Sequence, residues 1–240
     1  MCGVGGKDIT TLRYFGIYGS QHFSHNYDYT SSYSMGTERS SVTDITPLSK
    51  LSVNTKKSIK HLFLNNNNIK NIDNLYEFEN VENLRLEGNK IASLSGLYNN
   101  TTNTGMKNLT YLWVSYNNLG KDIEGAEMSP GTDSLSCLAI TSVDENEKYT
   151  FAKRFTKLSK LDLEHNESLK WIDYLKPYKS LSLLYLGGCS NLTNAGIVQA
   201  GDAITSASLL TLDEDYRFYL ATVDNNIKTL DLSRKDYDAK

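Results

Sequence analysis

One pattern of apolar residues recurs along this 240-residue chain, and it constrains the fold more than any other feature. In one-letter code the pattern is I-x-x-L-x-L-x-x-N-x-I, where x is any residue. The first clear copy consists of Ile59, Leu62, Leu64, Asn67 and Ile69. The second begins 81 − 59 = 22 residues later and consists of Val81, Leu84, Leu86, Asn89 and Ile91. Two unrelated segments rarely agree at so many positions, so the sequence predicts a stack of equivalent units.

Further copies are predicted on both sides of these two. Downstream units begin at Leu109, Leu135, Leu158, Leu181 and Ile227, with a weak unit over 204–212. The unit at Leu135 has Val143 where the others have asparagine. Upstream, residues 42–51 match the second half of a unit whose first half would begin near Ser32. One more copy is read at Ile9, Leu12, Tyr14 and Ile17. Ten strands spaced by about 4.8 Å would give a sheet arc of roughly 45 Å.

This pattern resembles the leucine-rich repeat family in its 22-residue form. The phrase Asp44-Ile45-Thr46-Pro47-Leu48-Ser49-Lys50-Leu51 is similar to the D-I-x-P-L-x-x-L segment of bacterial internalin-type repeats. Other units differ at the proline, where they have Asn74, Gly96 and Tyr174. Repeats of 22 residues also occur in intracellular regulators of protein phosphatases, so the repeat length leaves the compartment open.

Alternation within each unit predicts the fold. Along residues 61–65 it places Leu62 and Leu64 on one face and the other three residues on the opposite face. So short a strand is unstable alone, and copies must pair into a parallel sheet that buries the leucines. The apolar residues after Asn67 are three apart, which suits short 3₁₀ turns. We predict an α/β leucine-rich repeat solenoid, with a curved parallel β-sheet on the concave face and short 3₁₀ or helical turns and loops on the convex face.

A single domain over residues 1–240 is expected, because the period crosses every candidate boundary. Residues 1–31 would be a degenerate repeat or a cap, and 32–240 would be repeats. Solenoids need polar caps over their end repeats. Neither end has a clear cap pattern, so the alternative is that the chain is a segment of a larger protein.

The asparagine of each unit has a predicted structural role. It ends the strand, and its amide carries donors and an acceptor for backbone groups of the turn. We expect an internal ladder formed by Asn67, Asn89, Asn117, Asn166 and, as a buried substitute, Cys189.

Outward-facing strand positions are fixed by the pattern and are not needed for the core. The central column runs through Phe63, Arg85, Trp113, Ala139, Asp162, Tyr185, Ser208 and Asp231, and the column after it includes Asn65, Glu87, Ser115 and Glu164. Aromatic residues beside an arginine are typical of binding hot spots, although aromatics also suit strands for purely structural reasons. We predict partner binding by His61, Phe63, Arg85, Tyr111, Trp113, Lys160, Asp162, Leu183 and Tyr185.

Insertions interrupt the period at residues 98–105 and 120–134, and residues 144–148 are acidic. All three stretches are predicted to be surface loops.

Charge, cysteines and motifs argue against several classes of protein. The chain has 25 Lys and Arg against 28 Asp and Glu, a net charge of −3, which disfavours general nucleic-acid binding. No window approaches the roughly 20 apolar residues of a membrane span. Three scattered cysteines suit neither a disulfide framework nor a zinc site. No phosphate-binding, serine-hydrolase or zinc-protease motif is present. We therefore expect no enzyme activity, metal or cofactor.

The leading interpretation is a non-enzymatic module that binds a protein partner on its concave face. The internalin-type resemblance implies a bacterial surface or secreted protein with a role in adhesion. One alternative is a structural spacer or stalk of a larger surface protein. Another is an intracellular scaffold or regulatory subunit, which free cysteines and an N-terminus without a signal-peptide pattern favour. A carbohydrate ligand for the aromatic residues is a further alternative.

Overall fold

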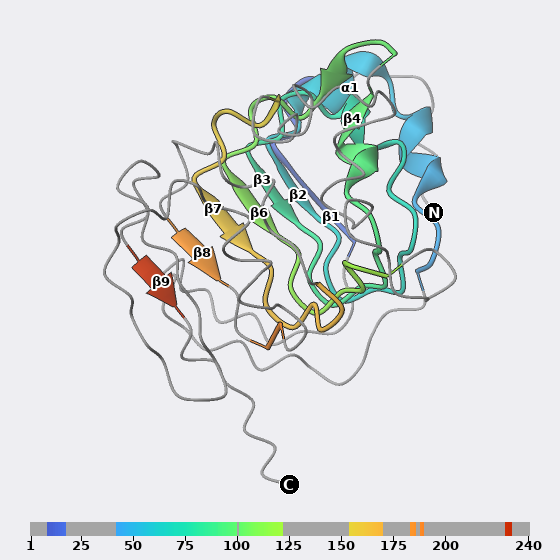
Figure 1. Cartoon of the computed structure of the whole chain (residues 1–240). Helices are drawn as coiled ribbons and strands as arrows, with labels where there is room; N and C mark the ends of the chain where they lie inside the picture. The colour runs from blue at the N-terminus through green and yellow to red at the C-terminus, as the bar shows by residue number, and fades with distance from the viewer. Residues whose placement is uncertain are drawn as a thin grey trace, which may run out of the picture.

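The computed structural model of the chain describes residues 9–17, 42–99, 101–121, 154–169, 183–185, 188–189 and 229–231. Its main element is a seven-stranded sheet in the order β1-β2-β3-β6-β7-β8-β9, which Figure 1 shows as a row of neighbouring strands. The strands are β1 (Tyr14–Gly16), β2 (His61–Phe63), β3 (Asn83–Arg85), β6 (Tyr111–Trp113), β7 (Lys160–Asp162), β8 (Leu183–Tyr185) and β9 (Thr229–Asp231). All neighbours pair in parallel, which confirms the predicted solenoid with a parallel sheet.

Leucines at the centres of the strands form the first layer of the core. Strand register places Leu62 beside Leu84, Leu84 beside Leu112 and Leu112 beside Leu161. All four are completely buried. A second buried column consists of Leu64, Leu86, Val114 and Leu163. Because burying one such side chain contributes about 1.5–3 kcal/mol, these columns are the main force that holds consecutive repeats together.

The return path of each repeat consists of short helical turns. These are the 3₁₀ helices η1 (Thr46–Lys50), η2 (Leu75–Glu77) and η3 (Ser95–Leu97), and the α-helix α1 (Val53–Ser58). Leu75 and Leu97 are buried against the strands, as the three-residue apolar spacing predicted. No helix of the described part of the chain is long and apolar enough to cross a membrane.

The first repeat differs from its prediction. Phe15 is in register with Leu62, and Ile17 follows it at the position of Leu64. Leu12, Phe15 and Ile17 therefore pack against the core, and Tyr14 is exposed on the other face. The predicted frame, which put Tyr14 in the core, is wrong by three residues.

Residues 42–51 complete this same repeat. The backbone N–H of Asn68 donates to Val42 O, just as Lys90 N donates to Ile69 O one repeat later. Val42 therefore takes the position of Ile69. Because β1 pairs directly with β2, a separate strand from a unit beginning near Ser32 has no place between them. That predicted repeat start lies outside the described residues.

Two predicted strands are also absent from the places expected for them. β6 pairs directly with β7, so the unit at Leu135, with Ala139 at its centre, does not separate them. β8 pairs directly with β9, so the unit over 204–212 does not separate these two either. Both units lie outside the described residues. Seven strands have six spacings, so the described sheet is about 29 Å long rather than 45 Å.

The insertion at residues 98–105 is a hairpin rather than the predicted loop. It consists of β4 (Tyr98–Asn99) and β5 (Thr104–Gly105), which pair antiparallel. Tyr98 is buried, and its ring meets Phe155 edge-on with 6.4 Å between ring centres. The guanidinium of Arg154 lies 4.0 Å from the centre of the Tyr98 ring. The insertion thus fixes the start of the 154–169 segment against an earlier repeat.

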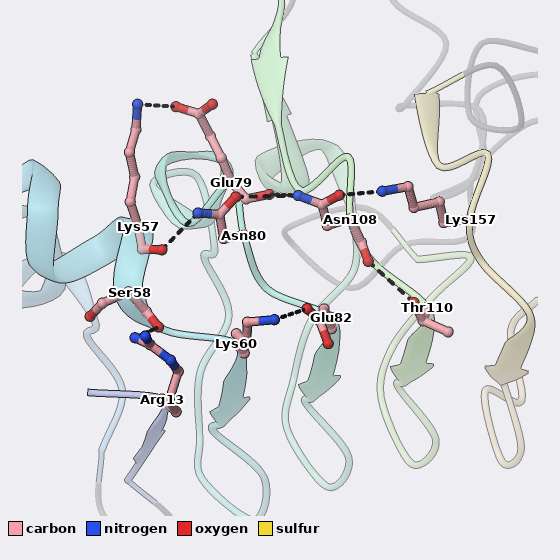
Figure 2. A network of polar contacts seen from close by, with 10 residues as sticks. All are labelled: Arg13, Lys57, Ser58, Lys60, Glu79, Asn80, Glu82, Asn108, Thr110 and Lys157. Carbon is pink, nitrogen blue, oxygen red and sulfur yellow. Dashed lines mark hydrogen bonds and ion pairs between the residues drawn. The ribbon is translucent and has the colours of Figure 1, made fainter. Parts of the chain in front are cut away.

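A row of polar side chains crosses the repeats near the N-terminal ends of the strands (Figure 2). Lys57 pairs with Glu79 at 3.7 Å and Lys60 pairs with Glu82 at 2.5 Å. Asn80 donates to the backbone oxygen of Lys57 at 2.7 Å. Figure 2 shows the row continuing through Asn108 to Lys157, whose Nζ lies 2.5 Å from Asn108 Oδ1. These exposed pairs link equivalent positions of consecutive repeats, and each contributes less than about 1 kcal/mol.

Candidate partner-binding face

Side-chain amides join neighbouring repeats where the strands end. Asn89 Nδ2 donates to Leu64 O of the preceding repeat and to Leu86 O of its own repeat, both at 2.9 Å. Asn89 Oδ1 accepts a hydrogen bond from the backbone N–H of Ile69 at 3.0 Å. The Asn89 side-chain amide therefore makes two hydrogen bonds to the preceding repeat, one as donor and one as acceptor.

Three other asparagines lie at the same position. Asn117 and Asn166 repeat the full set of bonds into the repeat that precedes each of them. Asn67 donates to Ile17 O at 2.8 Å, which ties the second repeat to the first. All four asparagines are buried. Their amide nitrogens donate to backbone oxygens, and the side-chain oxygens of Asn89, Asn117 and Asn166 accept from backbone N–H groups, so the geometry of this row is structural.

Cys189 occupies the ladder position of the turn after β8. Its thiol is buried and donates to Leu163 O at 3.1 Å, the bond that an amide makes elsewhere in the ladder. The backbone N–H of Leu169 already donates to Asn166 O at 2.9 Å, because this repeat has one extra residue after the asparagine. Burial raises the pKa of the Cys189 thiol to about 12, so the thiol is protonated at neutral pH and is a poor nucleophile.

The opposite side of the sheet carries the predicted partner-binding residues, and we call it the outward sheet face. Of the predicted binding residues, those whose side chains are described on this face are His61, Phe63, Arg85, Tyr111, Trp113, Lys160, Asp162 and Tyr185. Strand register brings Phe63, Arg85, Trp113 and Asp162 onto four consecutive strands. Leu183 lies in β8 beside Lys160, but its side chain is outside the described residues.

Three side chains form a continuous layer at the centre of this face, and we call Arg85, Trp113 and Tyr185 the Arg85 layer. The guanidinium carbon of Arg85 lies 5.8 Å from the centre of the Trp113 ring. Trp113 stacks on Tyr185 with ring centres 6.2 Å apart, although β7 lies between their strands. Trp113 therefore reaches across β7, where Asp162 is buried. The layer spans the strands from β3 to β8.

A second aromatic group lies at the N-terminal end of the outward sheet face. Tyr14 stacks on His61 with ring centres 4.3 Å apart, and the ring of Phe63 lies 6.4 Å from that of His61. Burial lowers the pKa of His61, so the ring is neutral at pH 7. The sequence reading missed Tyr14 because it placed this residue in the core. When Phe15 is aligned with Leu62, alternation places Tyr14 beside His61 on the outward sheet face.

The column after the strands is buried, contrary to prediction. Asn65, Glu87, Ser115 and Glu164 are each 6% exposed or less. The chain turns back directly after these residues, so the turn covers side chains that alternation alone would leave outside. Burial raises the pKa of Glu87 to about 6, although the charge of Arg85 acts to lower it. Among the described residues, no group of three or more His, Cys, Asp or Glu side chains is arranged to hold a metal ion.

Comparison with known proteins agrees with this fold. A family model described as leucine-rich repeats in two copies matches residues 57–99. No curated protein matches the chain. The chain is similar to three solved structures from Listeria monocytogenes, and it spans 29%, 58% and 44% of their lengths.

The first of these structures is the functional domain of InlJ, which includes a cysteine ladder. It is 23% identical over 62% of this chain, with a TM-score of 0.34. Internalin C2 is 21% identical over 62%, with a TM-score of 0.37. The internalin InlF is 20% identical over 64%, with a TM-score of 0.33.

The repeat type follows from the family match, the strand register and the asparagine ladder together. The chain contains leucine-rich repeats. Solenoids of stacked repeats present extended surfaces that are used for binding, so the fold indicates a protein–protein interaction module.

Proposed function

We propose that the outward sheet face binds a protein partner, without catalysis, and that Trp113 is the centre of the contact. The Arg85 layer is the observation that carries this proposal. Tryptophan, tyrosine and arginine are the residue types that most often dominate binding energy. Here Trp113 contacts both Arg85 and Tyr185 on the face that the leucine core does not use.

The layer is held in place before any partner arrives. Arg85 Nη2 and Nε each lie 2.8 Å from Glu87 Oε1, and the Trp113 ring is fixed between Arg85 and Tyr185. Side chains that are already ordered lose little conformational entropy on binding. Partner binding at this layer therefore retains more of its gross contact energy than binding to loose side chains would.

The size of the sheet indicates how the partner must lie. Strands of three residues are about 10 Å long, and the described sheet is about 29 Å across. A stable interface buries about 800 Å² on each partner, which is more than twice the product of that strand length and that sheet width. The partner therefore extends past the strand ends onto the neighbouring turns, with the Arg85 layer near its centre.

The proposed setting is the surface of a bacterial cell or its surroundings, with a role in adhesion. This part rests on the similarity of residues 44–51 to internalin-type repeats. Protease treatment of intact cells tests it, since a surface protein is digested while a cytoplasmic marker protein is protected.

Partner capture with matched variants tests the binding face. Wild type, Trp113→Ala and Val53→Ala are each immobilised after circular dichroism has established that they fold. Val53 is an apolar residue that is 63% exposed on α1, away from the sheet, so it controls for loss of any exposed apolar side chain. We expect a captured protein to be retained by Val53→Ala and to bind Trp113→Ala with at least about tenfold lower affinity, the effect of a hot-spot residue. Equal affinity for both variants would overturn the proposal.

A further inference from the structure

A row of left-handed backbone positions lies directly before the ladder. The angle φ is 54° at Asn66 and at Tyr116 and 53° at His165, and it is 68° at Gly88 and 71° at Gly188. Glycine and asparagine adopt this conformation readily, and histidine is more common there than most residues. A tyrosine is disfavoured because its Cβ crowds the backbone. Tyr116 is therefore held in a conformation that its residue type does not favour.

The strained tyrosine is part of a built arrangement across three turns. The Tyr116 and His165 rings stack with centres 4.1 Å apart and an angle of 18° between planes. His165 in turn lies against the bare backbone of Gly188, where an added Cβ would come within 2.3 Å of His165 Nδ1. Strained residues that their surroundings hold in place are concentrated at binding and catalytic sites.

A groove of about 280 Å³ opens beside this stack. Besides the two rings, it is lined by Lys90, Asn118, Lys121 and Glu167, which belong to turns rather than to the outward sheet face. Pockets for drug-sized ligands begin at about 300 Å³, so this groove suits a ligand of about one ring. None of the residues that line it belongs to the Arg85 layer.

The lining selects the chemistry of that ligand. Two lysines, Lys90 and Lys121, line the groove together with one carboxylate residue, Glu167, so an anionic group is favoured. Aromatic rings carry negative charge on their faces, so the face of the Tyr116 ring that His165 does not cover can attract the C–H groups of a sugar ring. The Asn118 side-chain amide can both donate to and accept from hydroxyl groups. We propose that this groove binds an acidic sugar, a single pyranose ring that carries a carboxylate.

Three probes separate the parts of this chemistry. ¹⁵N-labelled full-length protein is titrated with methyl β-D-glucuronide, with methyl β-D-glucoside and with acetate, and amide chemical shifts are followed. We expect the glucuronide to give saturable shifts at residues 116–121 and 165–168. The glucoside lacks the acid and acetate lacks the ring, so we expect both to bind at least about tenfold more weakly. Equal binding of acetate, equal binding of the glucoside, or no saturable shift with the glucuronide would overturn the proposal.

Matched variants locate the site. Tyr116→Asn removes the ring but keeps a residue that accepts the left-handed backbone, as Asn66 does. Tyr14→Asn makes the same chemical change on the outward sheet face. We expect glucuronide binding to be lost in Tyr116→Asn and kept in Tyr14→Asn. Lys121→Gln, which leaves the stack intact, should weaken the glucuronide and leave the glucoside unchanged. Unchanged glucuronide affinity in Tyr116→Asn or in Lys121→Gln would refute the site.

Discussion

Arg85 contacts a single oxygen of Glu87 with two of its nitrogens, Nε and Nη2, each 2.8 Å from Oε1. The other oxygen, Glu87 Oε2, is buried and has no hydrogen-bond partner among the described residues. The carboxylate charge is therefore only partly compensated, and the nearby charge of Asp162 opposes it further. Burial of this carboxylate, and to a smaller extent the charge of Asp162, therefore raises the pKa of Glu87 to about 6 in spite of the arginine.

The raised pKa predicts a pH dependence of stability. The pKa of Glu87 is about 6 in the folded chain and 4.5 when unfolded, so the folded protein binds this proton more tightly. Above pH 6 the buried charge lowers stability, and below pH 4.5 this cost is absent. A difference of 6 − 4.5 = 1.5 units corresponds to about 2 kcal/mol.

Urea unfolding of wild type and Glu87→Gln from pH 4.5 to 7 measures this linkage. The free energy of unfolding of wild type, relative to Glu87→Gln, should fall by about 2 kcal/mol as the pH rises through this window. A difference between the two proteins that is constant with pH would contradict the assignment to Glu87.

Removal of the Arg85 side chain should lower the free energy of unfolding more than removal of an exposed lysine does. In Arg85→Met the Glu87 carboxylate stays buried without its cation, and we expect a loss of about 3 kcal/mol at pH 7. Lys60→Met, which breaks a half-exposed pair with Glu82, should cost less than about 1 kcal/mol. Chemical denaturation of both variants makes the comparison. The double variant Arg85→Met/Glu87→Leu should recover most of the loss, and a failure to recover would show that the packing of Arg85, not the charge of Glu87, was responsible.

Truncation of a ladder residue should be among the most damaging single changes. Asn89→Ala leaves the backbone groups of Leu64, Leu86 and Ile69 without this partner, at about 1 kcal/mol or more each. We expect a loss of about 3 kcal/mol or more in the free energy of unfolding. Asn71→Ala on the surface is the control and should lose less than about 1 kcal/mol. Asn89→Cys should fall between them, because a thiol still donates. An Asn89→Ala loss no larger than the control's would remove the ladder from the stabilising interactions.

The hairpin at residues 98–105 depends on a glycine. A Cβ at position 105 would come within 2.5 Å of the Tyr98 ring and 2.7 Å of Leu97 O. Gly105→Ala should therefore displace the buried Tyr98 and lower stability by about 1–3 kcal/mol, the usual cost of overpacking. Thermal unfolding measures the loss, and tyrosine near-ultraviolet circular dichroism reports on Tyr98. A variant as stable as wild type would mean that the hairpin shifts without cost.

Periodicity predicted the leucine columns and the ladder because both depend on local spacing alone. Leu62, Leu84, Leu112 and Leu161 could be aligned from sequence, and the sheet pairs them in that order. Spacing does not say which strands are neighbours. The unit at Leu135 has the apolar spacing of a true repeat, yet β6 and β7 meet without it. Strand order is a long-range property that short motifs do not encode.

The sequence predicted which residues lie on the candidate binding face, but it did not predict which of them contact one another. Alternation put Trp113 and Tyr185 on one face, yet the predicted Ala139 strand would have placed them three strands apart. Direct pairing of β6 with β7 reduces this to two and allows the rings to stack. The burial of Glu87 was missed because alternation describes a strand and takes no account of the turn that follows it.

The change from amide to thiol at Cys189 also sets an order of disassembly. Asn89, Asn117 and Asn166 each make two cross-repeat bonds and Asn67 makes one. Within the described residues Cys189 makes one such bond, and it comes from a thiol, which is a weaker donor than an amide. In a stacked repeat protein the weakest junction separates first. We expect the chain to open at the junction between the Asn166 and Cys189 turns, with backbone amides after it exchanging hydrogen sooner than those of residues 59–119. Unfolding would then begin at this junction, and the N-terminal repeats would stay folded after the repeats that follow the junction have unfolded.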